Sequence, residues 1–278
     1  MYVLVAPCIL DPDLRARGIT SEEDREDFDR VVLRCRRFGI DMVPLPCPET
    51  LYLGRDRPPA SFLERLDTPE FTALLDRLEE EVRGIISERG DPLCIIGVDS
   101  SPACGVNATY YDTAKRPGRG AFLARFPDIR AVDAGQFARY RVYLAAPLFS
   151  EAEQQYNLVI HDLLTRHLFD VYLPQEVGDN SGCRDKAEHD RIFKKHVEAL
   201  NAADIVVAIC DGPDADSGTA WEMGYAYALG KRVVVLRTDF RMAGHRECVN
   251  LMLEESSTVV RSRDDLPSVL HSPLLLPP

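Results

Sequence analysis

Apolar residues along the chain occur in short, nearly continuous runs, and this pattern predicts buried β-strands. The runs are rich in Val, Ile, Leu and Tyr, and Gly, Pro or charged residues bound them. Strands that are buried on both faces of a sheet have this character. Strands are therefore predicted at 2–7, 41–45, 92–98, 129–133, 141–147, 170–174, 204–210, 232–237 and 258–262.

Between these runs, apolar residues recur at helical spacing within polar stretches, which predicts helices. Ser21 is a suitable N-cap for the first helix, and Gly39 is a suitable stop. The predicted helices cover 21–38, 69–89, 121–126, 134–140, 150–167, 184–203 and 219–230. Because strands and helices alternate without hairpin signals, we expect parallel sheets with crossover helices.

The same alternation occurs twice, and the second series begins with the strand at 141–147. We therefore expect an α/β protein of two Rossmann-like or flavodoxin-like domains, 1–139 and 140–278, each a parallel sheet flanked by helices. Such sheets bind ligands beyond the carboxyl ends of their strands. The loops that follow the strands are thus the places to look for functional residues.

Composition narrows the classes of partner. The 278 residues are 45% hydrophobic and carry a net charge of −12. An acidic chain argues against binding to nucleic acid polymers or to anionic membranes. The N-terminal apolar run is short and lacks a basic segment before it, which favours a strand over a signal peptide. We expect a cytoplasmic protein, in which the eight cysteines are thiols or metal ligands.

Glu222 lies in the segment "DSGTAWEMGYAYALG" at 216–230, which is otherwise almost free of charge. It follows Thr219 by three residues, so one interpretation is a capping box at the start of a helix. The small and apolar neighbours instead predict a helix buried on nearly all sides, where a carboxylate is costly without a task. In that interpretation Glu222 attacks, or stabilises positive charge at, the anomeric carbon of a sugar.

Residues 140–262 resemble the nucleoside 2-deoxyribosyltransferase family. The resemblance rests on four segments in the same order, "VYLAAPLFSEAEQQYN", "LNAADIVVAICDG", "DSGTAWEMGYAYALGKRVVVL" and "VNLM". It implies that Glu222 is the nucleophile, that Asp216 lies near the base and that Tyr143 orients Glu222. No cofactor is implied for glycosyl transfer.

The same resemblance implies how the substrate is held. Asn250 matches an asparagine that a neighbouring subunit lends to the sugar 5′-hydroxyl, which implies a homo-oligomer with a shared active site. Gly218, Phe149 and Met252 fall in the matching segments and are expected to line the substrate site. The Asn250 match also favours nucleosides over nucleotides as substrates.

His196 departs from the family pattern. It stands eight residues before Asp204, where the family has an aspartate that passes a proton to the leaving base. A histidine can donate a proton near neutral pH, so we expect His196 to take that task. The alternative is that His196 only occupies a helix face. The departure leaves the preferred base open, and also the choice between transfer to a second base and hydrolysis.

Three cysteines follow three predicted strands of the first half. They are Cys8, Cys47 and Cys104, and loops at one edge of a parallel sheet can converge. Three thiolates suit a soft metal or an iron–sulfur cluster with one open position. The alternative is that they are small buried residues without a metal.

Residues 1–133 resemble a family that includes thiouracil desulfidases. The resemblance rests on a cysteine after the first strand and on "CPE" at 47–49, "RDRPP" at 55–59, "SPACG" at 101–105 and "YYDTAKRPGRGAFLARF". It implies a [4Fe-4S] cluster on Cys8, Cys47 and Cys104, with one iron left to bind the sulfur of a thiolated base. Glu49 and Ser101 are then the candidate proton-transfer groups.

Together the two resemblances imply an enzyme of nucleosides and nucleobases, thiolated ones included. It would cleave or exchange an N-glycosidic bond and carry a desulfidase domain. Two alternatives stay open. The second half could be a sensor that binds a nucleotide derivative without turnover, or the cysteines could form a structural metal site only.

Overall fold

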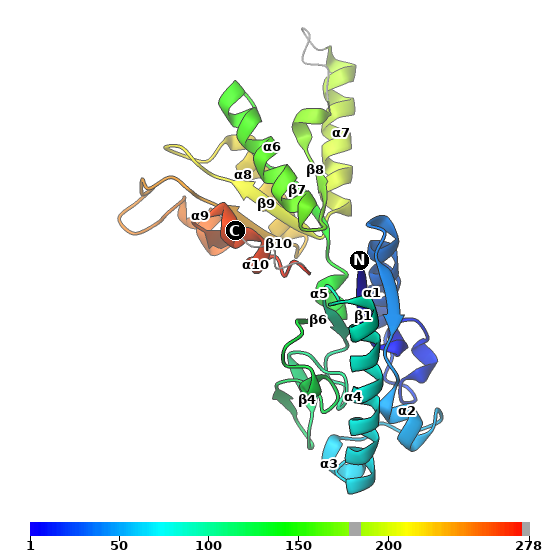
Figure 1. Cartoon of the computed structure of the whole chain (residues 1–278). Coiled ribbons are helices and arrows are strands. Elements are labelled where there is room, and N and C mark those ends of the chain that lie inside the picture. The colour runs from blue at the N-terminus through cyan, green and yellow to red at the C-terminus, as the bar shows by residue number, and fades with distance from the viewer. Residues whose placement is uncertain (178–184, 274–278) are drawn as a thin grey trace. The chain divides into compact units, whose positions relative to one another are not determined.

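The chain divides into two compact units, Met1–Ala138 and Arg139–Pro278. A computed structural model describes residues 1–177 and 185–273, and Figure 1 shows them coloured along the chain. Each unit has its own sheet. Within the described residues, no helix is both long enough and apolar enough to span a membrane.

The first unit is built on a four-stranded sheet in the order β2-β1-β3-β6, and all its strand pairs are parallel. Every residue of β1 is buried, because β1 lies inside the sheet with β2 on one side and β3 on the other. Its main strands and the helices α1, α4 and α5 are β1 (Tyr2–Val5), α1 (Glu22–Arg37), β2 (Asp41–Pro44), α4 (Pro69–Arg89), β3 (Ile95–Gly97), β6 (Ala131–Asp133) and α5 (Ala134–Phe137).

Short elements fill the long loops of this unit. They are η1 (Pro7–Ile9), η2 (Pro12–Leu14), α2 (Pro48–Leu53), α3 (Phe62–Arg65), β4 (Ala108–Tyr110), β5 (Lys115–Pro117) and η3 (Leu123–Arg125). The antiparallel β4–β5 pair corrects the expectation that hairpins are absent. Its turn is held by Asp112, which accepts a hydrogen bond from the Ala114 amide and pairs with Arg116. The helix expected at 121–126 is a single 3-10 turn.

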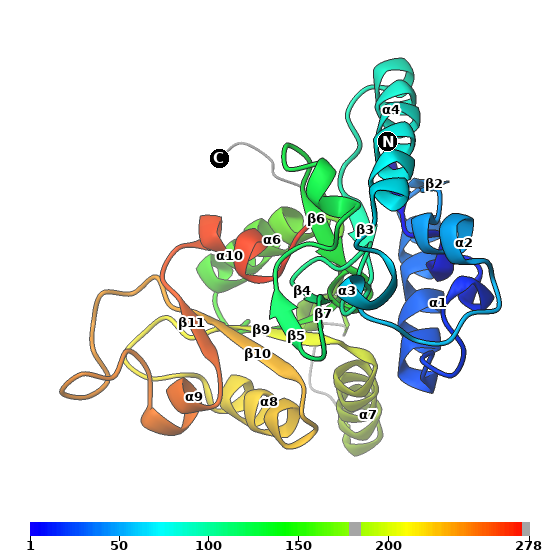
Figure 2. The same ribbon diagram turned by 90° about the horizontal axis from the view of Figure 1, so that it is seen from below.

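The second unit is built on a five-stranded sheet in the order β11-β10-β9-β7-β8, again with parallel pairs throughout. Figure 2 shows α6 and α10 on one face of this sheet and α7 and α8 on the other. Its main elements are β7 (Arg141–Ala145), α6 (Glu151–Arg166), β8 (Asp170–Tyr172), α7 (Lys186–Ala202), β9 (Ile205–Ile209), α8 (Ser217–Ala228), β10 (Arg232–Leu236), α9 (Leu251–Glu255), β11 (Thr258–Val260) and α10 (Leu266–Val269).

The two sheets share one topological feature. In each, the first strand in chain order lies between the second and the third, so β1 lies between β2 and β3, and β7 between β8 and β9. The connections leave this first strand in opposite directions, which opens a crevice at its carboxyl end. The α/β class with parallel sheets and flanking helices is confirmed, and the crevice predicts where each site lies.

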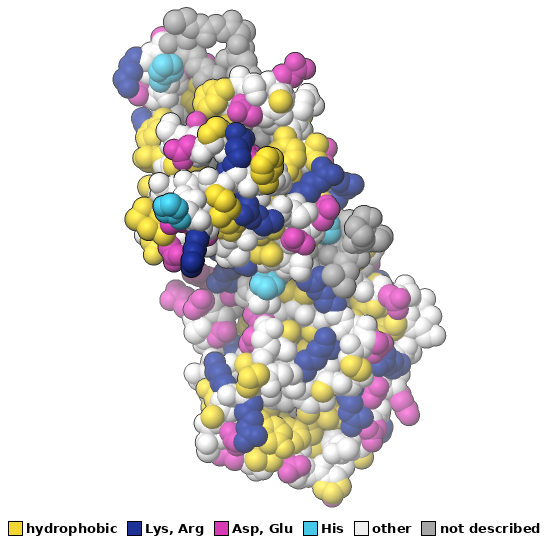
Figure 3. All heavy atoms as spheres, turned by 90° about the vertical axis from the view of Figure 1, so that its left-hand side faces the viewer, with side chains coloured by type: hydrophobic (Ala, Val, Ile, Leu, Met, Phe, Trp, Pro, Cys, Tyr) yellow, Lys and Arg dark blue, Asp and Glu magenta, His cyan; other side chains and the backbone are white. Residues whose placement is uncertain are grey.

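Charged side chains are mixed on the surface. On the face drawn in Figure 3, Lys and Arg side chains are interspersed with Asp and Glu, and neither sign forms a continuous area. That face therefore lacks the continuous basic stripe that binds a phosphate backbone, and the net charge of the chain is −12.

Candidate active sites

In the second unit, Glu222 contacts a tyrosine of strand β7. Glu222 lies on α8, and the Tyr143 hydroxyl on β7 donates a hydrogen bond of 2.5 Å to its Oε1 atom. Tyr143 is fully buried, so its ring is fixed by packing and its hydroxyl is held in place. The sheet thus orients one oxygen of the carboxylate.

The environment changes the pKa of Glu222. Burial raises the pKa to about 7 and is the largest effect, the hydrogen bond from Tyr143 lowers it, and the charge of Asp216 raises it. Burial also raises the pKa of Tyr143, so its hydroxyl stays protonated and is a donor at neutral pH. A carboxyl group with such a pKa can be ionised near neutral pH, in a site where partial burial makes the charge less favourable than in water.

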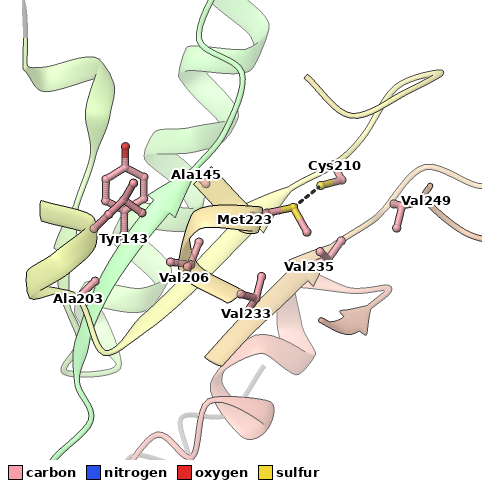
Figure 4. Packing of buried hydrophobic residues seen from close by; sticks show 12 residues of the cluster. Tyr143, Ala145, Ala203, Val206, Cys210, Met223, Val233, Val235 and Val249 are labelled. Atoms are coloured by element: carbon pink, nitrogen blue, oxygen red, sulfur yellow. Dashed lines mark hydrogen bonds between the residues drawn. The ribbon is translucent and has the colours of Figure 1, made fainter. Parts of the chain in front are cut away.

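Helix α8 buries only one face. Thr219, Met223 and Ala226 point into the core, while Trp221 and Tyr227 are exposed by 48% and 60%. Figure 4 shows Tyr143 at one end of this core cluster and the sulfurs of Met223 and Cys210, 3.7 Å apart, toward the other. The expectation of a helix buried on nearly all sides is therefore wrong, because Trp221 and Tyr227 lie on the outer face.

The start of α8 also differs from the capping-box interpretation. Asp216 is the N-cap, and its Oδ2 atom accepts a hydrogen bond of 3.0 Å from the Thr219 amide. The Glu222 carboxylate meets Tyr143 instead of the helix start. A Cβ atom at Gly218 would lie 3.0 Å from Asp216 Oδ2, so the small residue leaves room for this carboxylate.

A second tyrosine, which the sequence interpretation missed, lies beside Tyr143. The Tyr172 ring on β8 stacks on that of Tyr143 with centroids 5.2 Å apart. Its hydroxyl lies 3.0 Å from Nδ1 of His196 on α7, so the structure links His196 to the site through Tyr172. The apolar run at 170–174 predicted that Tyr172 lies on a strand. Only the pairing register of β7 and β8 shows that Tyr143 is its neighbour.

The other expected substrate contacts lie on exposed segments. Asn250 is the N-cap of α9, and its side chain accepts a hydrogen bond of 3.0 Å from the Met252 amide. Met252 and Phe149 are exposed by 75% and 78%. Phe149 precedes α6 in the loop after β7, and α9 packs against α8.

In the first unit, all the expected site residues line one cavity of about 450 Å³. The five are Cys8, Cys47, Cys104, Glu49 and Ser101. They come from the segments that follow β1, β2 and β3. These segments line the crevice that the strand order predicts at the carboxyl end of β1.

Hydrogen bonds fix the polar part of this cavity. The Ser101 hydroxyl donates to Glu49 Oε1 over 2.9 Å and accepts from the Cys104 amide, also over 2.9 Å. Arg57, only 4% exposed, lies 3.4 Å from Glu49 Oε2 and donates 2.8 Å to the Leu14 carbonyl. Glu49 is thus held between a hydroxyl and a guanidinium group.

The Cys104 loop passes very close to strand β3. A Cβ atom at Gly97 would lie 2.5 Å from the Cys104 carbonyl oxygen, so only glycine lets the loop take this path. Asp99 accepts hydrogen bonds from the amides of Val106 and Asn107, at 2.9 and 2.7 Å, and closes the loop on itself.

The thiols of Cys8 and Cys104 have little tendency to ionise. Burial raises the pKa of Cys8 to about 12 and that of Cys104 well above its usual value. The nearby Arg15 lowers the pKa of Cys8, while Cys47 raises the pKa of both thiols. Metal binding would reverse this preference, because a coordinated thiol is deprotonated.

The cavity is lined by three cysteines, and thiolates are the usual ligands of iron–sulfur clusters. Across residues 1–177 and 185–273, no three His, Cys, Asp or Glu side chains are arranged to hold one metal ion.

Comparison with known families bears on both sites. Residues 142–260 match the sequence profile of the family described as "Nucleoside 2-deoxyribosyltransferase". Residues 1–126 match that of the family described as "Putative 2-thiouracil desulfurase". The chain joins a 2-thiouracil desulfurase-like unit to a nucleoside 2-deoxyribosyltransferase-like unit. Both resemblances expected from the sequence are thereby confirmed.

Individual relatives cover one part of the chain each. The uncharacterized protein UU063 of Ureaplasma parvum is 33% identical over 131 residues, 42% of this chain and 82% of that protein. The 2-deoxyribosyltransferase of Bacillus psychrosaccharolyticus is 26% identical over 47% of this chain and 95% of its own, with a TM-score of 0.41. The [4Fe-4S]-dependent thiouracil desulfidase TudS is 22% identical over 49% and 91%, with a TM-score of 0.34.

Proposed function

We propose that the deoxyribosyltransferase-like unit cleaves the N-glycosidic bond of 2′-deoxynucleosides with Glu222 as the nucleophile. The observation that carries the proposal is the 2.5 Å hydrogen bond from the buried Tyr143 to Glu222. It orients a carboxylate that burial has made reactive, and leaves its second oxygen to attack.

The reaction has two displacements. The ionised Glu222 carboxylate attacks C1′, the bond from C1′ to the base nitrogen breaks, and the base leaves with the electron pair and takes up a proton. The sugar is then an ester of Glu222. A second base or water attacks C1′, loses a proton, and releases the carboxylate. The first acceptor gives transfer and the second gives hydrolysis.

The remaining residues bind and orient the substrate in this proposal. Asp216 accepts hydrogen bonds from the base with the Oδ1 atom that the helix cap leaves to it, and His196 exchanges the proton with the base. Gly218 and Phe149 line the site. Asn250 and Met252 reach the sugar of a neighbouring subunit, which agrees with their place on the exposed start of α9.

A homo-oligomer is part of this proposal. Phe193 on α7 and Trp221 on α8 are exposed, with ring centroids 5.8 Å apart, and the partly buried Tyr225 stacks on Trp221 at 5.2 Å. Exposed apolar areas of this kind are typical of interfaces between subunits. An oligomer would cover them and bring Asn250 to a neighbouring site.

The test is a transfer assay. Purified protein is incubated with 2′-deoxyinosine and free adenine, and products are separated by chromatography. We expect 2′-deoxyadenosine or free sugar, and a loss of about 10³-fold or more in Glu222→Gln. Glu151→Gln, an exposed change at the start of α6, is the control. Binding without turnover in the parent protein would contradict the proposal and favour a sensor of nucleotide derivatives.

We propose desulfuration of a thiolated nucleobase as the activity of the first unit. The supporting observation is the convergence of Cys8, Cys47 and Cys104 with the Glu49–Ser101 pair on one cavity. The three cysteines would hold a [4Fe-4S] cluster, which supplies an iron that binds the sulfur of the base. Ser101 and Glu49 hold and move the proton, and Arg57 keeps the Glu49 carboxylate in place.

Anaerobic reconstitution tests this second activity. We expect about four iron atoms per chain and turnover of 2-thiouracil, both lost in Cys47→Ser. Cys35→Ala, on the buried side of α1 away from the cavity, is the matched control. Zinc in place of iron, with no turnover, would support a structural metal site only.

A further inference from the structure

Two tyrosines from adjacent strands stand side by side beneath the nucleoside site. Tyr143 and Tyr172 are register partners in the β7–β8 pair, so their side chains lie on one face of the sheet. Their rings are stacked with centroids 5.2 Å apart and an angle of 20° between planes. One hydroxyl bonds the nucleophile Glu222, and the other lies 3.0 Å from His196 Nδ1.

We propose that Tyr172 is the positioning residue for the proton donor, holding His196 by Nδ1 so that Nε2 exchanges the proton with the base. The proposal rests on the proposed function of Glu222. The His196 ring stands edge-on to the Tyr172 ring, at 83° and 5.9 Å between centroids. One hydrogen bond and one ring contact together fix both the position and the plane of the imidazole.

The positions of the protons before and after the transfer are consistent with this role. As imidazolium, His196 donates Nδ1–H to the Tyr172 oxygen and gives the Nε2 proton to the base nitrogen, which holds the electron pair of the broken bond. The ring is then neutral with its proton on Nδ1. Tyr172 keeps its own proton throughout, because burial and the charge of Glu222 raise its pKa to about 12.

The stack also couples the two halves of the reaction. Tyr143 orients the group that attacks C1′, and Tyr172 orients the group that protonates the base. Because the two rings contact each other, the spacing between the hydroxyls that hold Glu222 on α8 and His196 on α7 is set by two neighbouring strands. Strands hold such a spacing more accurately than loops do.

The test uses two substrates that differ in their need for a proton. The base of 2′-deoxyinosine leaves as an anion unless it is protonated. The base of 7-methyl-2′-deoxyguanosine is already cationic and leaves neutral. For Tyr172→Phe, which keeps the stacking ring, we expect kcat/KM to fall about tenfold or more with 2′-deoxyinosine and less than about twofold with the methylated substrate.

Three further variants separate the roles. His196→Ala should show the same pattern, and Tyr172→Phe should add nothing to it in the double variant, since both remove one interaction. Tyr172→Ala, which also removes the stack on Tyr143, should lower turnover of both substrates. Tyr227→Phe, at an exposed tyrosine of α8, is the control.

The outcomes are distinct. If Tyr172→Phe matches the parent protein, or loses equally with both substrates, the role of Tyr172 is wrong and the proposed function stands. If the parent protein turns over neither substrate, the proposed function is wrong and this inference falls with it.

Discussion

The surroundings of Glu222 have opposing effects on its pKa. Burial and the charge of Asp216 favour the protonated acid, while the hydrogen bond from Tyr143 favours the carboxylate. Burial is the largest effect, and the pKa rises to about 7. The nucleophile is therefore ionised only in part at neutral pH, and two consequences can be measured.

The first consequence is a pH profile. Since only the carboxylate attacks, kcat/KM with 7-methyl-2′-deoxyguanosine, whose base needs no proton from His196, should rise with pH around a midpoint near 7. Tyr143→Phe removes the interaction that lowers the pKa, so it should move this midpoint to higher pH and slow the reaction. Tyr227→Phe should leave the midpoint in place. A midpoint in the usual range of glutamate, unmoved by Tyr143→Phe, would contradict this account.

The second consequence is a cost to stability. The folded protein binds the Glu222 proton more tightly than the unfolded chain, whose pKa is 4.5, so stability falls as pH rises from 4.5 to about 7. Glu222→Gln should thus raise the free energy of unfolding at pH 8 by up to about 3 kcal/mol, and change it little at pH 4. Urea unfolding followed by the single tryptophan, Trp221, measures it. An equal effect at both pH values would contradict it.

For single residues, the sequence pointed to some members of the candidate site but did not predict every contact between them. The four-segment resemblance pointed to Tyr143 and Glu222, and the structure places them in contact. Tyr172 stayed hidden because its role depends on strand register and on the approach of α7, and neither is written in local spacing. The exposed aromatic face of α8 was missed because hydrophobicity alone does not tell a core from an interface.

The start of helix α8 combines a structural task with a proposed chemical one. Asp216 caps the helix, so Asp216→Ala should lower the free energy of unfolding by about 1 kcal/mol. Asp216→Asn keeps a capping oxygen and should cost only a few tenths. Both variants should lose transfer activity if the second oxygen contacts the base. Full activity in Asp216→Asn would limit Asp216 to the helix cap.

The end of strand β3 carries a comparable constraint. Gly97→Ala places a Cβ atom against the Cys104 carbonyl, so we expect a loss of about 1–3 kcal/mol in stability and weaker iron loading. Gly84→Ala is the matched control, because it lies within α4 with no atom in reach and should stabilise the helix by up to about 1 kcal/mol. Equal iron loading in both variants would show that the Cys104 loop adapts.

Long elements were predicted well and short ones poorly. The helix at 69–89 was predicted with its observed bounds, and the Ser21 cap of α1 forms a capping box with Asp24. By contrast, α2 and the β4–β5 hairpin lie in segments that look like loops. Such short elements are set by tertiary contacts and turn bonds, since propensity over a few residues is a weak signal.

At the scale of the molecule, each unit has a complete sheet and core of its own. We therefore expect residues 139–278 to fold when produced alone, with helical and strand signals in circular dichroism and a cooperative thermal transition. Residues 1–138 should do the same. A fragment that stays unfolded, or that folds only when its counterpart is added, would show that the units depend on each other.

Strand β2 has a further consequence for the chain in solution. It lies at an edge of the first sheet, where another chain could add a strand. The Leu45 amide donates inward to Val5, so the nitrogen of Pro44 faces outward, and proline has no hydrogen to offer there. Asp41, at the other end of β2, is exposed and charged. This edge is therefore a poor template for β-aggregation while the second unit is still being synthesised.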